Sequence, residues 1–178
     1  ALEVAPGDDV IVPAFGYPAT ANAVELLGGR AIPADIDPES MALSAESVAR
    51  VATERTVGVV PVHPFGIPAP MVELEALAEE RGWWVCEDAA CAMGTALDGR
   101  WARGEHLICL SFHPRKTLTT GEGGAVVTRD ARLAERLRIL RNHGVATDFA
   151  SRGWSRFTHA GFNYRLTDIA AAIGEVQM

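Results

Sequence analysis

The chain has 178 residues; 48% of them are hydrophobic, 22% are charged, and the formal net charge is −7. This composition is typical of a folded globular protein, and an acidic chain without a basic stripe argues against a nucleic-acid partner. No apolar run approaches the about 18 residues that span a bilayer, and the N-terminus lacks the regions of a signal peptide, so we predict no membrane partner.

Short apolar runs alternate with helical patterns along the whole chain. The runs predict strands at 10–14, 30–35, 56–62, 83–88, 107–112 and 125–128. Helices are predicted at 18–27, 45–52, 70–81 and 131–141, and a last one begins near Thr167. Because helices separate the strands, we predict an α/β fold in three layers, a mostly parallel, doubly wound sheet flanked by helices.

Local signals mark the ends of three predicted helices. Ser44 is a predicted N-cap, and Ser47 stands where a capping box would place glutamate. Asp130 is the predicted N-cap of helix 131–141, and Gly82 closes helix 70–81. The chain also ends inside its last helix, so we read it as an interior part of a longer protein.

The cysteines bear on compartment and on metal binding. Cys86, Cys91 and Cys109 fit a reducing compartment, which predicts a cytoplasmic protein. The spacing of Cys86 and Cys91 does not match a zinc knuckle, and we predict no metal site.

Chemically capable residues follow two of the predicted strands, and parallel sheets bind ligands at the carboxyl ends of their strands. Asp88 ends strand 83–88 before small residues, where a carboxylate can pair with a protonated nitrogen of a flat ring; a helix N-cap is the alternative. Ser111 and Lys116 flank the turn predicted at His113, and the glycine-rich stretch 119–124 lets the backbone bend closely around a ligand.

Lys116 is the one lysine among the 16 cationic side chains of the sequence; the other cations are arginines. An arginine guanidinium stays protonated, whereas a lysine amine can lose its proton and form a Schiff base with a carbonyl carbon. A surface lysine retained by chance is the alternative interpretation. The flanking residues favour chemistry at this position.

Six motifs in order resemble the DegT/DnrJ/EryC1/StrS family of sugar aminotransferases, which depend on pyridoxal phosphate (PLP) and have PLP fold type I. They are GDDVIVP (7–13), PVHPFG (61–66), EDAA (87–90), SFHPRK (111–116), TGEGG (120–124) and GFNYR (161–165). The resemblance implies that residues 1–178 are part of the PLP-binding large domain. The family's N-terminal segment and C-terminal small domain would then lie outside this sequence.

The resemblance also implies roles for single residues. Lys116 would hold PLP as a Schiff base and later move a proton between the substrate and the cofactor. Asp88 would keep the pyridine nitrogen protonated, which makes the ring an electron sink. Ser111 would bond the cofactor phosphate. Tyr17 would stack on the pyridine ring, the alternative being an aromatic residue packed within its own turn.

Four further residues receive roles in the same way. Asn163 would reach the phosphate of the neighbouring subunit's cofactor, which implies a homodimer with shared active sites. Arg165 would grip a substrate carboxylate, unless it is an ordinary surface charge. Cys91 stands where the family usually has Gln or His beside the cofactor, and we expect it to tune that contact. His113, which precedes Lys116, resembles the residue at this position in family members that act on 4-keto-6-deoxy sugars.

The leading hypothesis is a PLP-dependent aminotransferase that moves an amino group, from glutamate, to a nucleotide-linked keto-sugar in two half-reactions. Sugar dehydratases of the same family resemble this fold with histidine at the lysine position, so Lys116 argues against that alternative. A non-catalytic PLP-binding or regulatory protein is a second alternative. A Rossmann dehydrogenase is disfavoured because no G-x-G-x-x-G follows the first strand. The sugar, the nucleotide and the aminated carbon stay open.

Overall fold

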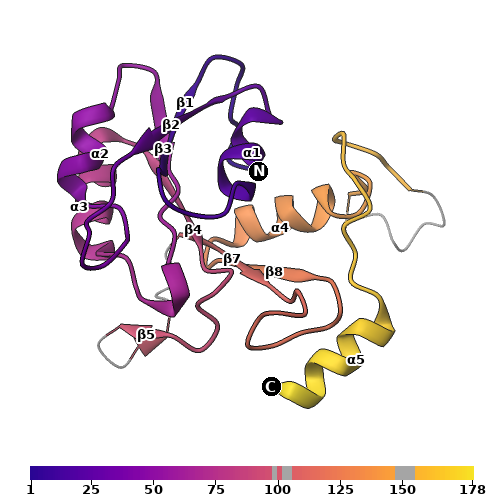
Figure 1. The fold of residues 1–178 in the computed structure, drawn as a ribbon. Coiled ribbons are helices and arrows are strands. Elements are labelled where there is room, and N and C mark those ends of the chain that lie inside the picture. Colours follow the sequence, from indigo (N-terminus) through magenta and orange to yellow (C-terminus); the bar gives the residue numbers. More distant parts are fainter. Residues whose placement is uncertain (98–99, 102–105, 147–154) are drawn as a thin grey trace.

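The computed structural model describes residues 1–97, 100–101, 106–146 and 155–178 (Figure 1). Within this part of the chain, one sheet has the strand order β2-β1-β3-β4-β7-β8. Its strands are β1 Asp9–Pro13, β2 Arg30–Ala34, β3 Thr56–Val59, β4 Trp84–Asp88, β7 Leu107–Ser111 and β8 Gly124–Val127. Neighbouring strands are parallel except for β8, which runs antiparallel to β7. A separate antiparallel pair joins β5 Ala96–Leu97 to β6 Arg100–Trp101.

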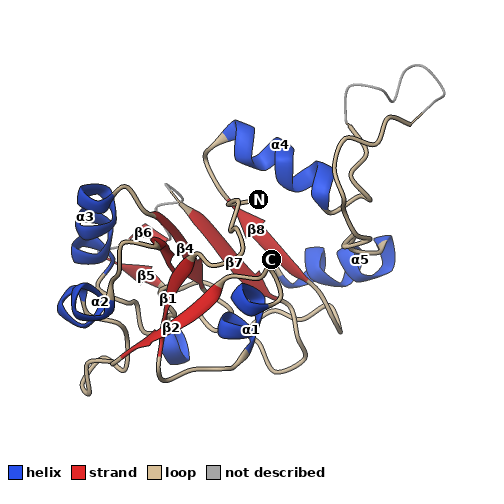
Figure 2. Ribbon diagram, turned by 90° about the horizontal axis from the view of Figure 1, so that it is seen from above, coloured by secondary structure: helices blue, strands red, loops and turns tan. Residues whose placement is uncertain are grey.

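Helices cover both faces of the sheet (Figure 2). They are α1 Ala19–Glu25, α2 Ala45–Val51, α3 Met71–Arg81, α4 Ala131–Leu140 and α5 Asp168–Gln177, with a 3-10 turn η1 Pro64–Gly66. In Figure 2, α2 and α3 lie together on one side of the sheet and α1 on the other. The three-layer α/β architecture predicted from the sequence is therefore confirmed. None of the helices in the described residues is long and apolar enough to cross a membrane.

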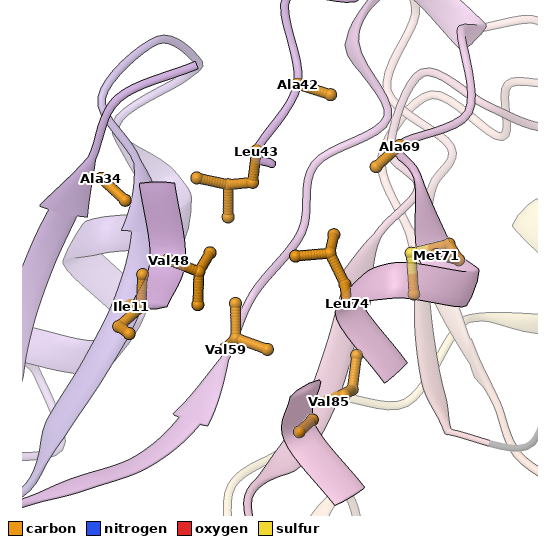
Figure 3. Close-up of a cluster of buried hydrophobic side chains, with 11 residues drawn as sticks. Ile11, Ala34, Ala42, Leu43, Val48, Val59, Ala69, Met71, Leu74 and Val85 are labelled. Carbon is orange, nitrogen blue, oxygen red and sulfur yellow. The ribbon is translucent and has the colours of Figure 1, made fainter. Parts of the chain in front are cut away.

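Alternate residues of the strands build the two sides of the core, because successive side chains of a strand point to opposite faces. Ile11, Val59 and Val85 pack with Val48 of α2 and Leu74 of α3, as Figure 3 shows. On the other face, a second cluster contains Val10, Val12, Val24 and Val60. Burial on both faces explains why β3 shows no alternation of apolar and polar residues.

The predicted caps are present. The Ser44 hydroxyl accepts from the Ser47 N–H at 3.1 Å, and the Ser47 hydroxyl accepts from the Ser44 N–H at 3.3 Å, so serine replaces glutamate in this capping box. The Asp130 carboxylate accepts from two backbone N–H groups of α4. Gly82 ends α3 with φ 68°, a left-handed conformation that favours glycine.

The strand predicted at 56–62 is shorter in the structure, where β3 ends at Val59. The chain continues beside its neighbours, but Pro61 has no N–H to donate to a ladder. Beyond Val59, pairing with β4 is therefore reduced to an isolated bridge between Val62 and Asp88. This interruption lies directly beside the candidate site.

The last part of the chain packs against two places. Backbone hydrogen bonds join His143 to Phe162 and Leu140 to Phe162, so the segment before α5 lies against the carboxyl end of α4. At its far end, α5 contacts the turn between β7 and β8, where the Gln177 amide bonds both the N–H and the carbonyl of Thr119 (Figure 1).

Candidate active site

The candidate site lies at the carboxyl edge of the sheet, where β4 and β7 end. Asp88 is the last residue of β4 and pairs with Cys109, two residues before Ser111 ends β7. Parallel register therefore brings Asp88 and Ser111 to the same edge, as the strand-end argument predicted. Tyr17 follows β1, whose carboxyl end lies at this edge as well.

Asp88 is held by bonds to its side chain and to its backbone. Its Oδ2 accepts from the Thr20 hydroxyl at 2.6 Å, and its Oδ1 accepts from the Ala90 N–H at 3.1 Å. Its backbone N–H donates to the Pro61 carbonyl at 2.8 Å. No helix begins between residues 89 and 95, all of which the structure describes, so the helix N-cap alternative for Asp88 does not apply.

Thr20 is a site residue that the sequence analysis missed. It lies on α1, is buried, and reaches Asp88 across 68 positions of the sequence. A polar residue on the sheet-facing side of a short helix is the signal that could have drawn attention to it. Its partner could not be inferred, because that requires knowing where α1 packs on the sheet relative to the end of β4.

Lys116 lies in the turn after β7, half-buried, with its backbone N–H bonded to the His113 carbonyl at 2.9 Å. Its Nζ donates to Cys91 Sγ at 3.1 Å, so the turns that follow β4 and β7 meet at this pair. The structure thus brings together Lys116 and Cys91, two residues predicted for the site. The sulfur of cysteine is a weak hydrogen-bond acceptor, so this contact holds the amine only loosely.

Ser111 and His113 contact each other within the turn. The Ser111 hydroxyl oxygen accepts from the His113 N–H at 3.3 Å, a bond that does not use the hydroxyl hydrogen. His113 Nδ1 accepts from the Arg115 N–H at 3.2 Å, so one edge of the ring supports the lysine turn. A substrate contact for His113 stays a prediction, as does the phosphate contact for Ser111.

Aromatic side chains are exposed beside this edge. Tyr17 is 81% exposed, which is unusual for so large a ring. Phe15 and Phe65 form a tilted pair with ring centroids 6.2 Å apart, and both are exposed as well. Tyr17 is thus accessible to a flat ligand, but its stacking role stays a prediction.

Asn163 and Arg165 lie in the segment that packs against α4. Asn163 forms an isolated bridge with Asn142, and its Oδ1 accepts from the Arg165 N–H at 3.4 Å. The Arg165 guanidinium donates to the Asn142 side chain at 2.7 Å. Both residues are exposed, and among the described residues no bond links them to Asp88 or Lys116. The shared-site and substrate-anchor roles therefore stay predictions.

A pair of thiols lies next to Asp88 on β4 and β7. Cys86 and Cys109 are unbridged, with their sulfur atoms 3.8 Å apart. The hydrogen bond with Cys109, burial and the neighbouring carboxylates raise the pKa of Cys86 well above its ordinary value. Cys86 is consequently a neutral thiol at physiological pH.

These residues fit the chemistry of PLP, which needs an amine, a carboxylate for its ring nitrogen and donors for its phosphate. The Asp88 carboxylate is half-buried and oriented by two donors, and the Lys116 amine stands at the same edge beside Cys91. Ser111 supplies a hydroxyl there. Within the described residues, no group of three or more His, Cys, Asp or Glu side chains is placed to hold a metal ion.

Comparison with known proteins identifies the family. The model of the DegT/DnrJ/EryC1/StrS aminotransferase family matches residues 1–178. The chain belongs to this family. The resemblance found in the six motifs is therefore confirmed.

Solved structures of aminotransferases are similar over nearly the whole chain. DesV of S. venezuelae, crystallised with a ketimine intermediate, is 39% identical with a TM-score of 0.91, over 99% of this chain and 46% of DesV. DesI, crystallised in the presence of its TDP-sugar product, is 39% identical with a TM-score of 0.84, over 97% of this chain and 43% of DesI. NtdA of Bacillus subtilis, with bound cofactor PMP, is 31% identical with a TM-score of 0.86, over 97% of this chain and 39% of NtdA.

These likenesses confirm the predicted fold class, a PLP-dependent transferase fold. The chain spans less than half the length of each of these three proteins. The division into a partial large domain and outlying segments stays a prediction.

Proposed function

We propose that the full-length protein is a PLP-dependent aminotransferase that transfers an amino group from glutamate to a nucleotide-linked keto-sugar. The observation that carries the proposal is the meeting of Asp88, Ser111 and Lys116 at one edge of the sheet in a chain of this family. The sugar substrate is supported by DesI, whose structure was determined with a TDP-sugar product.

When bound, PLP supplies a conjugated ring that accepts electrons from the substrate carbon. Lys116 would hold the cofactor through Nζ and, once released, carry a proton to and from the substrate. Asp88 would hold the proton on the ring nitrogen, and Thr20 fixes the carboxylate for this contact at 2.6 Å. Ser111 would donate to the phosphate, and Tyr17 would cover the ring.

Lys116 suits proton transfer because its surroundings do not bind the amine to a carboxylate. Among the described residues its side chain bonds to Cys91, and no salt bridge there involves it. An ammonium paired with a carboxylate would lose its proton less readily. Without a carboxylate partner, the Lys116 amine is free to accept and return a proton in the proposed reaction.

The cofactor proposal is tested by labelling the full-length protein. Protein mixed with PLP should gain a visible absorption band, and borohydride followed by peptide mapping should place the label on Lys116. Lys116→Arg should show no band, because arginine keeps the charge but does not condense with an aldehyde. A label on any other residue would overturn the assignment.

The substrate proposal is tested by turnover. Glutamate and a nucleotide-linked 4-keto-6-deoxy sugar should yield 2-oxoglutarate and an amino sugar in equal amounts. The same sugar without the nucleotide is the matched control and should react far more slowly. Turnover of a simple 2-oxo acid but of neither sugar would contradict the substrate class and leave the cofactor proposal standing.

We also propose that the active site is shared between two subunits, with Asn163 reaching the partner's cofactor and Arg165 binding the substrate. Exposure of both residues is compatible with contacts to a second chain. Mixed dimers of Lys116→Ala and Asn163→Ala chains should regain activity, because one of their two sites has both residues intact. If both variants are inactive alone, and hybrids form but regain no activity, Asn163 acts within its own subunit.

A further inference from the structure

A buried polar pair lies behind Asp88 and has no part in the proposed chemistry. His63 and Glu87 are each 6% exposed, and His63 Nε2 lies 3.0 Å from Glu87 Oε2. Glu87 precedes Asp88 in β4, and strand alternation directs the two carboxylates to opposite faces of the sheet. Two buried groups of this kind cost desolvation energy, so their presence calls for an explanation.

The bonds around His63 fix the orientation and the tautomer of its ring. The Ala69 N–H donates to His63 Nδ1 at 3.0 Å, so Nδ1 carries no proton. Nε2 must then carry the hydrogen and donate it to Glu87. With both nitrogens bonded, the ring cannot turn without losing a buried hydrogen bond, which is a substantial penalty.

The same two segments are joined through their backbones at Asp88. The His63 N–H donates to the Asp88 carbonyl at 3.1 Å, and the Asp88 N–H donates to the Pro61 carbonyl at 2.8 Å. Regular pairing of β3 has ended before this point, leaving only the bridge between Val62 and Asp88. The side-chain bond between His63 and Glu87 reinforces the alignment where the ladder is weakest.

The loop that His63 closes also contacts the segment carrying Cys91. Phe65 has φ 54°, a left-handed conformation that a bulky residue keeps only when its surroundings impose it. The Gly66 carbonyl accepts from the Thr95 hydroxyl at 2.9 Å, and a Cβ on Gly66 would lie 3.2 Å from the Cys91 carbonyl oxygen. Loop 63–69 is therefore packed against both ends of the segment 88–95.

We infer that His63 and Glu87 are positioning residues, which hold Asp88 at the height and angle needed to meet the cofactor's ring nitrogen. A buried pair of this kind adds little net stability compared with apolar residues, so its contribution lies in geometry. The inference rests on the proposed function for its catalytic consequence. The local ordering of Asp88 does not depend on that function.

The experiment compares Glu87→Leu with Glu87→Gln in the full-length protein, with Asp9→Asn as the control. Glutamine keeps an oxygen that accepts from His63, whereas leucine leaves the His63 N–H without a partner. Asp9 is another buried carboxylate of the same sheet. It lies in β1, which β3 separates from β4, and is therefore distant from Asp88. Its loss should weaken the fold without moving Asp88.

In the cofactor-free protein, Glu87→Leu should accelerate amide hydrogen exchange at Asp88 and His63 about 10-fold or more beyond the change at the other amides of β4. In Glu87→Gln and Asp9→Asn, exchange at Asp88 and His63 should change no more than at those amides. In the PLP-loaded protein, Glu87→Leu should shift the visible absorption spectrum and lower kcat about 10- to 100-fold, the cost of misplacing a catalytic group by about 1 Å. Glu87→Gln should keep a spectrum and a kcat close to those of the wild type.

Two results for a folded Glu87→Leu protein would overturn the inference. One is unchanged hydrogen exchange at Asp88. The other is changed exchange together with the spectrum and kcat of the wild type. If Glu87→Leu does not fold, His63→Gln replaces it, because glutamine can donate to Glu87 but not also serve Ala69; it should show the same pattern more weakly. If the wild type takes up no PLP, the proposed function fails, and the exchange rates still decide whether the pair orders Asp88.

Discussion

Two aspartates at opposite ends of the sheet show how the same side chain becomes structural in one place and available in another. Asp9 begins β1, is fully buried, and accepts from Arg30 at 2.6 and 2.7 Å and from Thr53 at 2.6 Å. Asp88 ends β4, is half-buried, and accepts from Thr20 and from a backbone N–H. No salt bridge of the described residues involves Asp88.

The difference lies in how fully each carboxylate is neutralised. Burial by itself would raise the pKa of Asp9, but the bonds from Thr53 and Arg30 and the charges of Arg30 and Arg55 outweigh it and lower the pKa. Asp9 is thus an anion satisfied by its own chain. Asp88 has oriented oxygens and no cation, so it can still attract a protonated ring nitrogen.

Replacement of Asp88 should have the largest effect. Asp88→Asn removes the charge that would keep the ring nitrogen protonated, and kcat should fall about 10²- to 10³-fold, as for other lost electrostatic partners in preorganised sites. The thermal unfolding midpoint should change little. Steady-state kinetics and calorimetry measure the two quantities. Near-normal turnover of Asp88→Asn would remove Asp88 from the catalytic group.

Asp9→Asn should show the reverse pattern, with lost stability and wild-type kcat in the folded protein. The loss should be about 2 kcal/mol, below the about 3–5 kcal/mol of a fully buried pair, because Arg30 is 46% exposed. Since folding lowers the pKa of Asp9, its contribution is present above the ordinary value of 3.8 and disappears as pH falls through the folded value.

Urea unfolding at several pH values measures that dependence. The difference in unfolding free energy between wild type and Asp9→Asn should be constant from pH 5 to 7 and shrink as the pH falls below the ordinary value of 3.8. A difference that grows as pH falls would contradict the ion-pair account of Asp9.

The two threonines that bond these aspartates offer a matched pair of substitutions. Thr20→Val should lower kcat about 10-fold by freeing the Asp88 carboxylate, a loss near 1.4 kcal/mol of transition-state stabilisation. Thr53→Val removes the equivalent bond to Asp9 and should lower stability by about 1–2 kcal/mol without changing kcat. If the two substitutions changed kcat equally, Asp88 and Asp9 would not differ in their contribution to catalysis.

The smallest effect is expected at Cys91, which contacts Lys116 rather than either aspartate. Cys91→Gln introduces a residue usual in the family and should shift the visible spectrum of bound PLP while changing kcat by no more than about 3-fold. Cys109→Ser is the control, since it alters a thiol of the sheet that does not contact Lys116. Loss of PLP binding in Cys91→Gln would show that the thiol is required.

The contrast between the aspartates could not be predicted from the sequence. Both stand at the ends of apolar runs beside another acidic residue, Asp8 in one case and Glu87 in the other. What separates them is the arrival of Arg30 and Thr53 at one and of Thr20 at the other, over sequence separations of 21, 44 and 68 positions. The pairing of His63 with Glu87 is a long-range contact of the same kind.

The sequence by itself determined the features that depend on neighbours in the chain. Strand and helix positions follow from hydrophobic periodicity, and the caps at Ser44, Gly82 and Asp130 from local hydrogen bonding and backbone conformation. The strand-end positions of Asp88 and Ser111, and the rarity of Lys116, are visible in the same way. Tertiary structure decided which side chains meet, because the strand order and the packing of α1 on the sheet bring distant residues into contact. Hydrogen bonds to a carboxylate act over about 3 Å, so its role is settled only when those neighbours are in place.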